Sequence, residues 1–524
     1  MRMSMYRILS LTILAVLLLP ELASVLDSFQ SSDGTWTWET YRGLLPNSDN
    51  VTLLKNSIVL GLWTAFLSTV LGVLFALVAG RTNVVPWRML LMLVSLPLFF
   101  PPYLHAVAWI HLIGPGGFMA RTLGNEGSLG FVGLVYGLPG ATTCLTLAYF
   151  PVSALCALAC LLLADPRLEE EARLHTGPLR VLLRVSLPSA TPGILTGFIL
   201  VFLLAVVDFG VPDQLFYRVY PTEIFARFSA FYDSKGATAL AMPSLIFCLG
   251  LIAAWRPWLF RQVFQFPGRQ EPFAPPVRVK GAWRWILRGI LIFPLAVILF
   301  PVIVFLLKAS GTPLAETFRS VNDELVQSLF IALVSATLCV TVAVLGMGCS
   351  VSRMTIMGTA LLFVLPAPFL GISLIVFWNR PGILGVLYGT NALLILGMVS
   401  RFLFVAVLLW IAARRMLDRQ LLEQAEVDGA GPLRTLVYVK IPLLFPSLAV
   451  AWMICFAFVL GEVGVSVLLV PPGGATLAVR IQTLMHYGPE PMLAGTAFIL
   501  VACLLIPALA AAGLVQWLVK ERSI

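Results

Sequence analysis

The chain has 524 residues, of which 59% are hydrophobic and only 11% are charged, and its mean hydropathy is +0.96. No soluble core needs that much apolar sequence, so the composition excludes a water-soluble domain and predicts an all-α polytopic membrane protein. The net charge of +9 does not indicate a nucleic-acid-binding protein, because no separate basic, aromatic-rich domain exists to bind one.

Apolar runs long enough to cross a bilayer, about 20 residues each, occur twelve times along the chain. We predict spans at 7–26, 54–80, 88–113, 138–163, 189–210, 237–258, 285–308, 326–350, 358–378, 391–413, 443–470 and 491–518. Residues 1–26 lack a convincing small-residue cleavage site, so we interpret them as a retained first helix and not a signal peptide. The stretch 129–163 contains Gly137-Leu138-Pro139-Gly140, so it holds either one span or a re-entrant piece followed by one span.

Three further features concern the spans and the outer loops. The eight cysteines all lie in apolar runs without disulfide or zinc spacing, so we interpret them as small hydrophobic residues. The loop 27–52 carries Trp36, Trp38 and Tyr41, which are typical of anchors at the membrane interface. Prolines are expected to break the third and ninth spans, namely Pro97, Pro101, Pro102, Pro366 and Pro368.

Two polar islands interrupt the apolar runs: the first island at 169–188 and, 254 residues later, the second island at 423–442. Aligned without a gap, they share eight identities in twenty positions, so the chain is a tandem repeat. Gly429 after Asp428 is typical of a helix end, and Gly431-Pro432 is typical of a new helix start. Each island is therefore predicted to form two short kinked helices outside the bilayer. An ordinary solvated loop would explain one island, but not two at matched places.

The repeat divides the chain into two halves of six spans each, 1–255 and 285–524, joined by a Pro- and Arg-rich linker at 256–284. Because six is an even number, both halves share one orientation and are predicted to pack about a pseudo-two-fold axis along the membrane normal. With the N-terminus in the cytoplasm, most Lys and Arg residues fall on the inner side. We therefore expect both termini, both islands and the linker in the cytoplasm, and a translocation path between the halves.

The second island resembles the EAA loop of ABC-importer permeases, with Glu423, Gln424, Ala425, Gly429 and Pro442 at the matching positions. The first island is a degenerate copy, in which Glu169 is kept but His175 replaces the glycine. The resemblance implies loops that dock on a cytoplasmic ATPase, with both glutamates at the contact and with Gly429 and Gly431 setting the kink. In the first island Gly177 would supply the flexibility. The coupling residues it implies are Glu169, Gly177, Pro178, Pro188, Glu423, Ala425, Gly429, Gly431, Pro432 and Pro442.

The same resemblance determines the expected partners. The chain has no GxxxxGK[ST] loop, so ATP hydrolysis is expected on separate homodimeric cytoplasmic ATP-binding subunits, and the chain is expected to be a transport subunit without enzyme activity, cofactor or metal. No soluble domain is large enough to capture a substrate, so an extracytoplasmic substrate-binding protein is expected as well. The resemblance implies a multi-pass protein of the bacterial cytoplasmic (inner) membrane.

The expected substrate also follows from resemblance. The layout is most similar to the ferric-iron group of fused permeases, with Asp208-Phe209-Gly210 and Thr222-Glu223-Ile224 adding to it. Thiamine and phosphonate permeases share the architecture, so ferric iron, then thiamine, then a phosphonate is the expected order. The permease sequence constrains the substrate weakly, because selectivity would lie mainly in the binding protein.

Ionisable residues within spans are rare and costly, which makes them candidates for function. Asp208 and Glu462 are also 254 residues apart and lie near the outer ends of corresponding spans. They either line the outer mouth of a path or cap neighbouring helices, and Arg401 either pairs with Glu462 or lines the path. His105 and His111 are six residues apart, on different helix faces, which argues against a shared metal site.

Two other classes of protein compete with the importer. An ion-coupled secondary transporter also has twelve spans in two parallel halves, but it would depend on Asp208, Glu462 and Arg401 alone and would leave the islands unexplained. A membrane scaffold or receptor is disfavoured, because the duplicated core carries no sensory domain.

Overall fold

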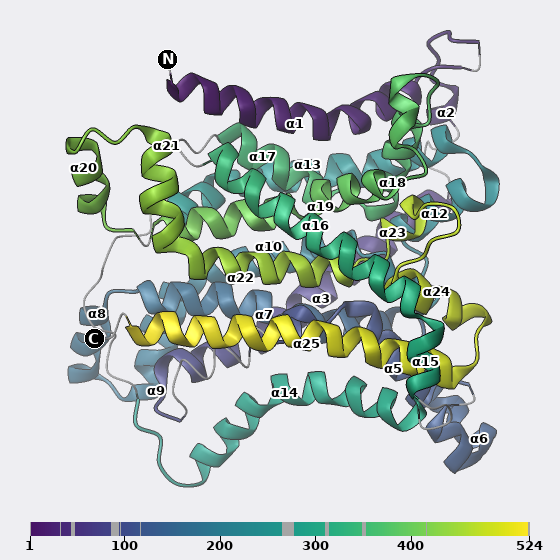
Figure 1. Ribbon diagram of the computed structural model, residues 1–524. Helices are drawn as coiled ribbons and strands as arrows, with labels where there is room; N and C mark the ends of the chain where they lie inside the picture. Colours follow the sequence, from purple (N-terminus) through teal and green to yellow (C-terminus); the bar gives the residue numbers. More distant parts are fainter. Residues whose placement is uncertain are drawn as a thin grey trace. The chain divides into compact units, whose positions relative to one another are not determined.

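The computed structural model describes residues 2–31, 33–42, 48–84, 94, 96–115, 117–264, 277–309, 314–347, 353–415 and 417–521. Within these ranges the regular structure is helical, and β-pairing is limited to isolated bridges. Ten of the described helices are long and apolar enough to cross a membrane, and a bent pair makes an eleventh candidate. The chain is therefore an all-α polytopic membrane protein (Figure 1).

The ten long helices match ten of the predicted spans. They are α1 (Arg2–Asp27), α3 (Ser48–Arg81), α7 (Gly137–Leu163), α10 (Leu187–Val206), α13 (Ser234–Phe264), α14 (Ala282–Ala309), α16 (Asn322–Met347), α19 (Asn391–Arg414), α22 (Ile441–Leu460) and α25 (Glu490–Glu521). The break expected before the fourth span lies at Gly137, where φ is +74°, between α6 (Phe118–Val135) and α7.

The two remaining predicted spans are the ones that proline was expected to break. The ninth consists of α17 (Arg353–Val364) and α18 (Ala367–Trp378), which meet at an angle of 104° around Leu365-Pro366. Proline lacks an N–H and restricts the residue before it, so a continuous helix cannot pass this point without distortion. Of the third, the described part is a short 3₁₀ turn (Leu96–Phe99) and α5 (Pro102–Ile113), and residues 88–93 and 95 lie outside the described residues.

The remaining short helices lie between the long ones. They are α2 (Glu39–Arg42), α8 (Pro166–His175), α9 (Pro178–Val181), α11 (Gly210–Gln214), α12 (Tyr220–Phe231), α15 (Leu314–Ser320), α20 (Arg419–Val427), α21 (Pro432–Thr435), α23 (Ser466–Leu469) and α24 (Leu477–Tyr487).

The chain forms two compact units that do not coincide with the two halves of the sequence. One comprises Met1–Ser57, Val207–Leu251 and Leu306–Ala511, and the other comprises Ile58–Val206, Ile252–Phe305 and Ala512–Ile524. Helix α13 continues to Phe264, and residues 265–276 of the predicted linker lie outside the described residues. The predicted linker and the two-fold arrangement of the halves stay predictions.

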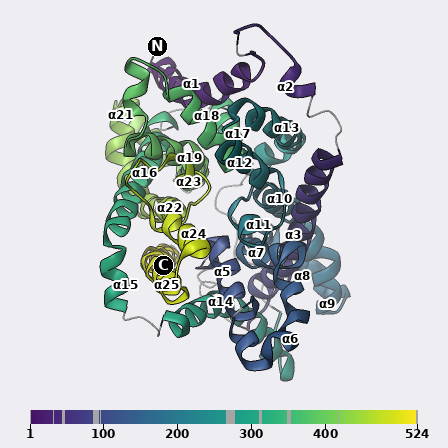
Figure 2. The same ribbon diagram turned by 90° about the vertical axis from the view of Figure 1, so that its right-hand side faces the viewer.

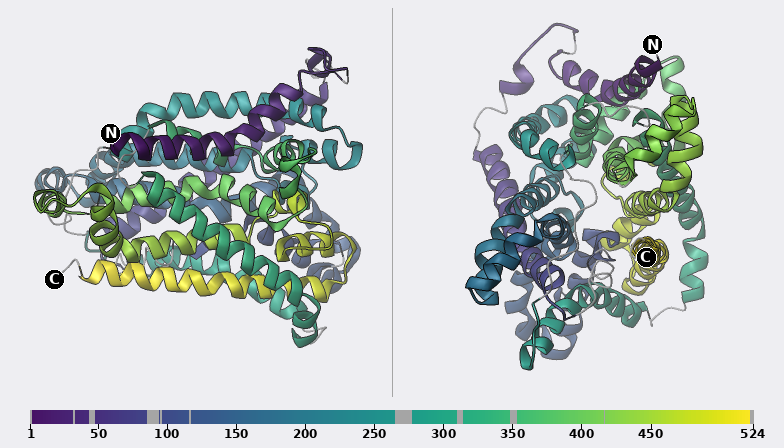
Figure 3. Two further views of the ribbon diagram at one scale, coloured as in Figure 1. Left: turned by 45° about the horizontal axis from the view of Figure 1, so that its top comes forward. Right: turned by 90° about the vertical axis from the view of Figure 1, so that its left-hand side faces the viewer.

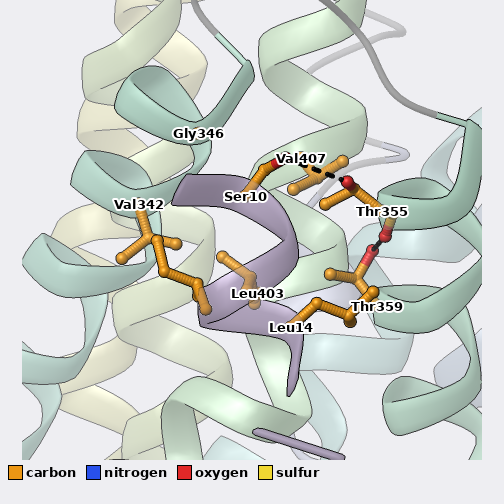
Figure 4. A pocket seen from close by; sticks show the side chains of 9 residues that line it. Ser10, Leu14, Val342, Gly346, Thr355, Thr359, Leu403 and Val407 are labelled. Carbon is orange, nitrogen blue, oxygen red and sulfur yellow. Dashed lines mark hydrogen bonds between the residues drawn. The ribbon is translucent and has the colours of Figure 1, made fainter. Parts of the chain in front are cut away.

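The first membrane helix of each half packs in a unit built mainly from the other half. Helix α1 lies against α16, α17 and α18 (Figures 1 and 2). Small residues allow α1 to pack closely here, because a Cβ at Gly358 would lie 2.5 Å from Leu14 Cδ1. Thr355 also donates a hydrogen bond to Ser10, with 3.4 Å between the two hydroxyl oxygens (Figure 4). Close approach at small residues is a common way to join helices in a membrane.

Helix α14, the first membrane helix of the second half, packs in the unit built mainly from the first half. It is bowed in Figure 1 and contains Pro294 and Pro301. The ring of Phe300 lies 4.7 Å from that of Trp109, measured between centroids. Buried Leu291 and Val297 join an apolar core made by α3, α7 and α10. The exchange of α1 and α14 is a long-range feature that apolar patterning alone does not predict.

Candidate coupling loops and outer contact

The second island forms the two short helices that its sequence predicts. The Asp418 carboxylate caps α20 by accepting a hydrogen bond from the backbone N–H of Gln420 at 2.9 Å. The helix ends before Gly429, whose φ of +75° is the left-handed conformation that a glycine adopts without a Cβ clash. Helix α21 then starts at Pro432, after an extended Gly431. Helix α20, yellow-green, projects beyond the ends of α19 and α22 (Figures 1 and 3).

The first island has the same helices but a different turn. Asp165 caps α8 through the N–H of Arg167 at 3.0 Å, and α9 starts at Pro178. Helix α8 includes His175, and the chain turns at Thr176, which is extended with φ −141°. Gly177 has a φ of −69°, which is accessible to every residue, and the flexibility expected of it stays a prediction.

The second short helix of each island continues directly into a membrane span. Helix α9 passes through a π-helical turn (Leu182–Ser186) into α10, and α21 passes through a matching turn (Leu436–Lys440) into α22. The helical runs therefore begin at Pro178 and Pro432, before the starts of the predicted spans 189–210 and 443–470. The widened turn accommodates Pro188 and Pro442, which lack an N–H for the helix ladder. The short helix and the span are therefore joined without an intervening loop.

The glutamate that the two islands share, Glu169 in the first and Glu423 in the second, has opposite surroundings in the two copies. The Glu169 side chain is 2% exposed, and its Oε1 lies 2.7 Å from Nε of Arg81 and accepts a hydrogen bond from Ser186 Oγ at 2.8 Å. The side chain therefore does not face the surface where the resemblance placed it. Glu423 is exposed, and with Gln420, Gln424, Val427 and Asp428 it lines an open notch on α20. Ala425 on the same helix is half-buried.

After the ends of α10 and α22, Asp208 and Glu462 occupy equivalent positions and make equivalent bonds. Asp208 Oδ1 accepts from the N–H of Val211 at 2.9 Å, and Glu462 Oε1 accepts from the N–H of Val465 at 3.0 Å. Each carboxylate thus satisfies a backbone N–H at the start of the short helix that follows the break, in the first turn of α11 and at the residue before α23. This is the capping role that was one of the two alternatives for the pair.

Arg401 pairs with Glu462. Its Nε lies 3.2 Å from Glu462 Oε2, and its Nη1 donates to the carbonyl of Leu365 at 3.3 Å. The two side chains are only 13% and 12% exposed, so each charge compensates the other in a poorly hydrated site. The guanidinium joins α19, the break between α17 and α18, and the break after α22.

Residues that the sequence did not single out join the two halves beside this pair. A Cβ on Gly464 would lie 3.5 Å from the Cβ of Phe209, so the two breaks touch. Gln482 of α24 donates to the carboxylate of Asp213 and accepts from Gln214, both of α11. Burial raises the pKa of Asp213, whereas the hydrogen bond from Gln482 and the nearby His486 lower it. Gln, Asp and His on short helices between the spans carry no periodic signal, so the sequence alone did not mark this contact between α11 and α24 (Asp213, Gln214 and Gln482).

Comparison with known proteins identifies the family. The chain is 31% identical over 203 residues to a probable molybdenum ABC transporter permease protein of Haloferax volcanii, covering 38% of this chain and 71% of that protein. The chain belongs to the ABC transporter permeases. It also resembles the putative ferric transport system permease protein FbpB 1 of Haemophilus influenzae, at 23% identity over 482 residues, 86% of this chain and 75% of that protein. The molybdenum transport system permease protein ModB of Mycobacterium tuberculosis is 30% identical over 212 residues, 39% of this chain and 78% of that protein. No family model matches the chain.

As an ABC importer permease, this chain is a multi-pass transport subunit of the inner membrane. Permeases of this family work with ATP-binding and substrate-binding partners, which agrees with the absence of a phosphate-binding loop from the sequence.

Proposed function

We propose that this permease imports ferric iron delivered by an extracytoplasmic binding protein. The observation that carries the proposal is the length of the match: the ferric permease of Haemophilus influenzae aligns with 86% of this chain, across both halves. The molybdenum permeases have a higher sequence identity, but they align with only 38% and 39% of this chain, a length no greater than one half of the repeat. Molybdate is therefore the second candidate, and thiamine and phosphonates share the architecture without a specific observation in their favour.

The two islands are proposed as the sites where a homodimeric ATPase docks from the cytoplasm, with both termini on the same side. The Lys and Arg distribution supports this orientation, because both islands and the linker carry basic residues. In the second island the exposed notch around Glu423 would receive the ATPase, and Gly429 would set the angle between α20 and α21. The continuous helix from Pro432 to Leu460 would then carry the displacement across the membrane.

At the outer side, the contact of Gln482 with Asp213 and Gln214 is proposed to break when the path opens outward. It consists of side-chain hydrogen bonds between short helices, which are easier to exchange for water than a packed core. The Arg401–Glu462 pair is proposed to persist throughout the cycle, because separating it would leave an uncompensated buried charge. Asp208 and Glu462 would shape the mouth by holding the breaks rather than by binding iron.

The test is uptake into proteoliposomes that contain this chain with its ATPase and binding protein, using radiolabelled ferric iron and molybdate in parallel. We expect iron uptake that requires ATP and is abolished in a Glu423→Lys/Gly429→Asp variant that still folds. Glu316→Lys, which reverses an exposed charge on α15, is the matched control and is expected to transport normally. Uptake of molybdate without uptake of iron would overturn the proposal that ferric iron is the substrate. Uptake driven by an ion gradient without ATPase would overturn the importer and favour an ion-coupled secondary transporter.

A further inference from the structure

The side chain of Arg81 joins three segments of one unit at a single buried point. Arg81 is the last residue of α3, and both it and Glu169 of α8 are 2% exposed. Its Nε lies 2.7 Å from Glu169 Oε1, and its Nη2 donates to the carbonyl of Leu161 near the end of α7 at 2.5 Å. The guanidinium therefore fixes the start of the first island to the inner ends of α3 and α7.

The carboxylate of Glu169 extends this point to a fourth segment. Ser186, in the π-helical turn between α9 and α10, donates to the same Oε1 at 2.8 Å. Both ends of the first island, α8 and the turn that enters α10, are thus held by one ion pair. A buried pair of this kind is weak evidence for net stability, but removing one partner leaves a charge without compensation. The pair therefore specifies position more than it adds stability.

The same end of α3 is bound on another side to the segment that connects the two halves. The N–H of Val277 donates to the carbonyl of Arg81 at 2.9 Å, and the N–H of Asn83 donates to the carbonyl of Val277 at 3.3 Å. The N–H of Val279 donates to Asn83 Oδ1 at 3.0 Å. Residues 277–280 lead directly into α14. The first island and the entry to α14 are therefore both tied to residues 81–83.

We propose that Arg81 is a positioning residue for transport, which locks the first island, the inner end of α3 and the entry to α14 into one body. The first island then acts as a rigid lever, and force applied to α8 reaches α3, α10 and α14 together. This rests on the proposed coupling role of the islands. Arg81 touches neither substrate nor ATP, so its effect is on how hydrolysis is converted into transport.

The first experiment compares Arg81→Gln, Glu169→Gln and the double variant in proteoliposomes with ATPase and binding protein. We expect ATPase binding and ATP hydrolysis to persist while iron uptake per ATP falls about tenfold, a typical coupling effect between sites. The double variant is expected to lose no more than the single variants, because the residues act as a pair. Arg319→Gln is the control, because Arg319 is an exposed arginine on α15, outside both islands, and it is expected to leave uptake per ATP unchanged.

A second measurement does not depend on the buried pair. An Asn83→Cys/Val279→Cys variant places two thiols where a hydrogen bond already joins the segments. If α3 and the entry to α14 move as one body, oxidation to a disulfide leaves uptake unchanged, with the single-cysteine variants as controls. Uptake that is blocked by oxidation and restored by a reductant would overturn the proposal.

The two proposals fail separately. Normal uptake per ATP in all Arg81 and Glu169 variants would refute the lock while leaving the importer intact. A wild-type chain that transports without ATP would refute the importer, and the lock with it.

Discussion

The two islands have nearly the same backbone but opposite side-chain surroundings. Both begin with an Asp-capped helix and continue through a π-helical turn into a span. In the first island the repeated glutamate is buried against Arg81, and in the second it is exposed in an open notch. The two copies of the repeat therefore keep the same backbone form, whereas the glutamate they share is buried in one copy and exposed in the other.

The difference extends to the turns. The second island bends at Gly429 in a left-handed conformation, whereas the first bends at an extended Thr176 after a helix that includes His175. A glycine turn and an open notch suit a surface that adapts to a partner. A buried ion pair and an ordinary extended turn suit a fixed element.

The largest expected effect separates the two glutamates. Glu169→Ala leaves the buried charge of Arg81 uncompensated, so we expect it to destabilise the protein by about 3–5 kcal/mol. Glu423→Ala removes an exposed carboxylate and is expected to change stability little. Thermal unfolding of both variants in the same detergent measures the difference. Equal shifts in the midpoint would show that the two positions are equivalent after all.

A smaller effect separates the two glycines. Gly429→Ala forces a Cβ into a left-handed residue and is expected to cost about 1 kcal/mol. Gly177 has φ −69° with no heavy atom within 4 Å of an added Cβ, so Gly177→Ala is expected to be neutral or to stabilise by up to about 1 kcal/mol. The same unfolding measurement applies, and a loss at position 177 as large as that at 429 would contradict the conformational argument.

The smallest effect concerns the contact of Gln482 with Asp213 and Gln214, where we expect stability to depend on pH. Burial raises the pKa of Asp213, so the folded state holds its proton at a pH where the unfolded state has lost it. The stability that Asp213 contributes is therefore present below the ordinary carboxyl pKa and is lost as the pH rises through the higher pKa of the folded state. Asp213→Asn keeps an oxygen that accepts from Gln482 and removes the titration. We expect its unfolding midpoint to vary less with pH above the ordinary carboxyl pKa of about 4 than that of the wild type. Identical pH profiles would show that Asp213 does not titrate differently on folding.

Local chemistry explains what the sequence predicted. Asp-capped starts, a glycine stop at Gly429 and prolines at first helical positions depend on neighbours within a few residues, and the structure confirms the paired short helices. The break of the ninth span followed from Pro366 for the same reason.

Contacts between distant segments explain what it did not predict. Arg81 and Glu169 are 88 residues apart, and Gln482 and Asp213 are 269 residues apart. In neither case does the spacing leave a signal in one sequence. Arg401 lies in an otherwise apolar span, and its pairing with Glu462 was one of the two alternatives that the sequence left open, so here the fold decides between them.

The exchange of first helices has a consequence for how the protein is made and removed. Helix α1 packs in one unit and α14 in the other, so each unit is completed by a helix from the opposite half of the chain. The unit that receives α1 cannot close during synthesis until the second half has been inserted, although α1 precedes every other helix of that unit in the chain. Removal of either half of the chain would likewise take helices from both units, so neither half leaves a complete unit behind.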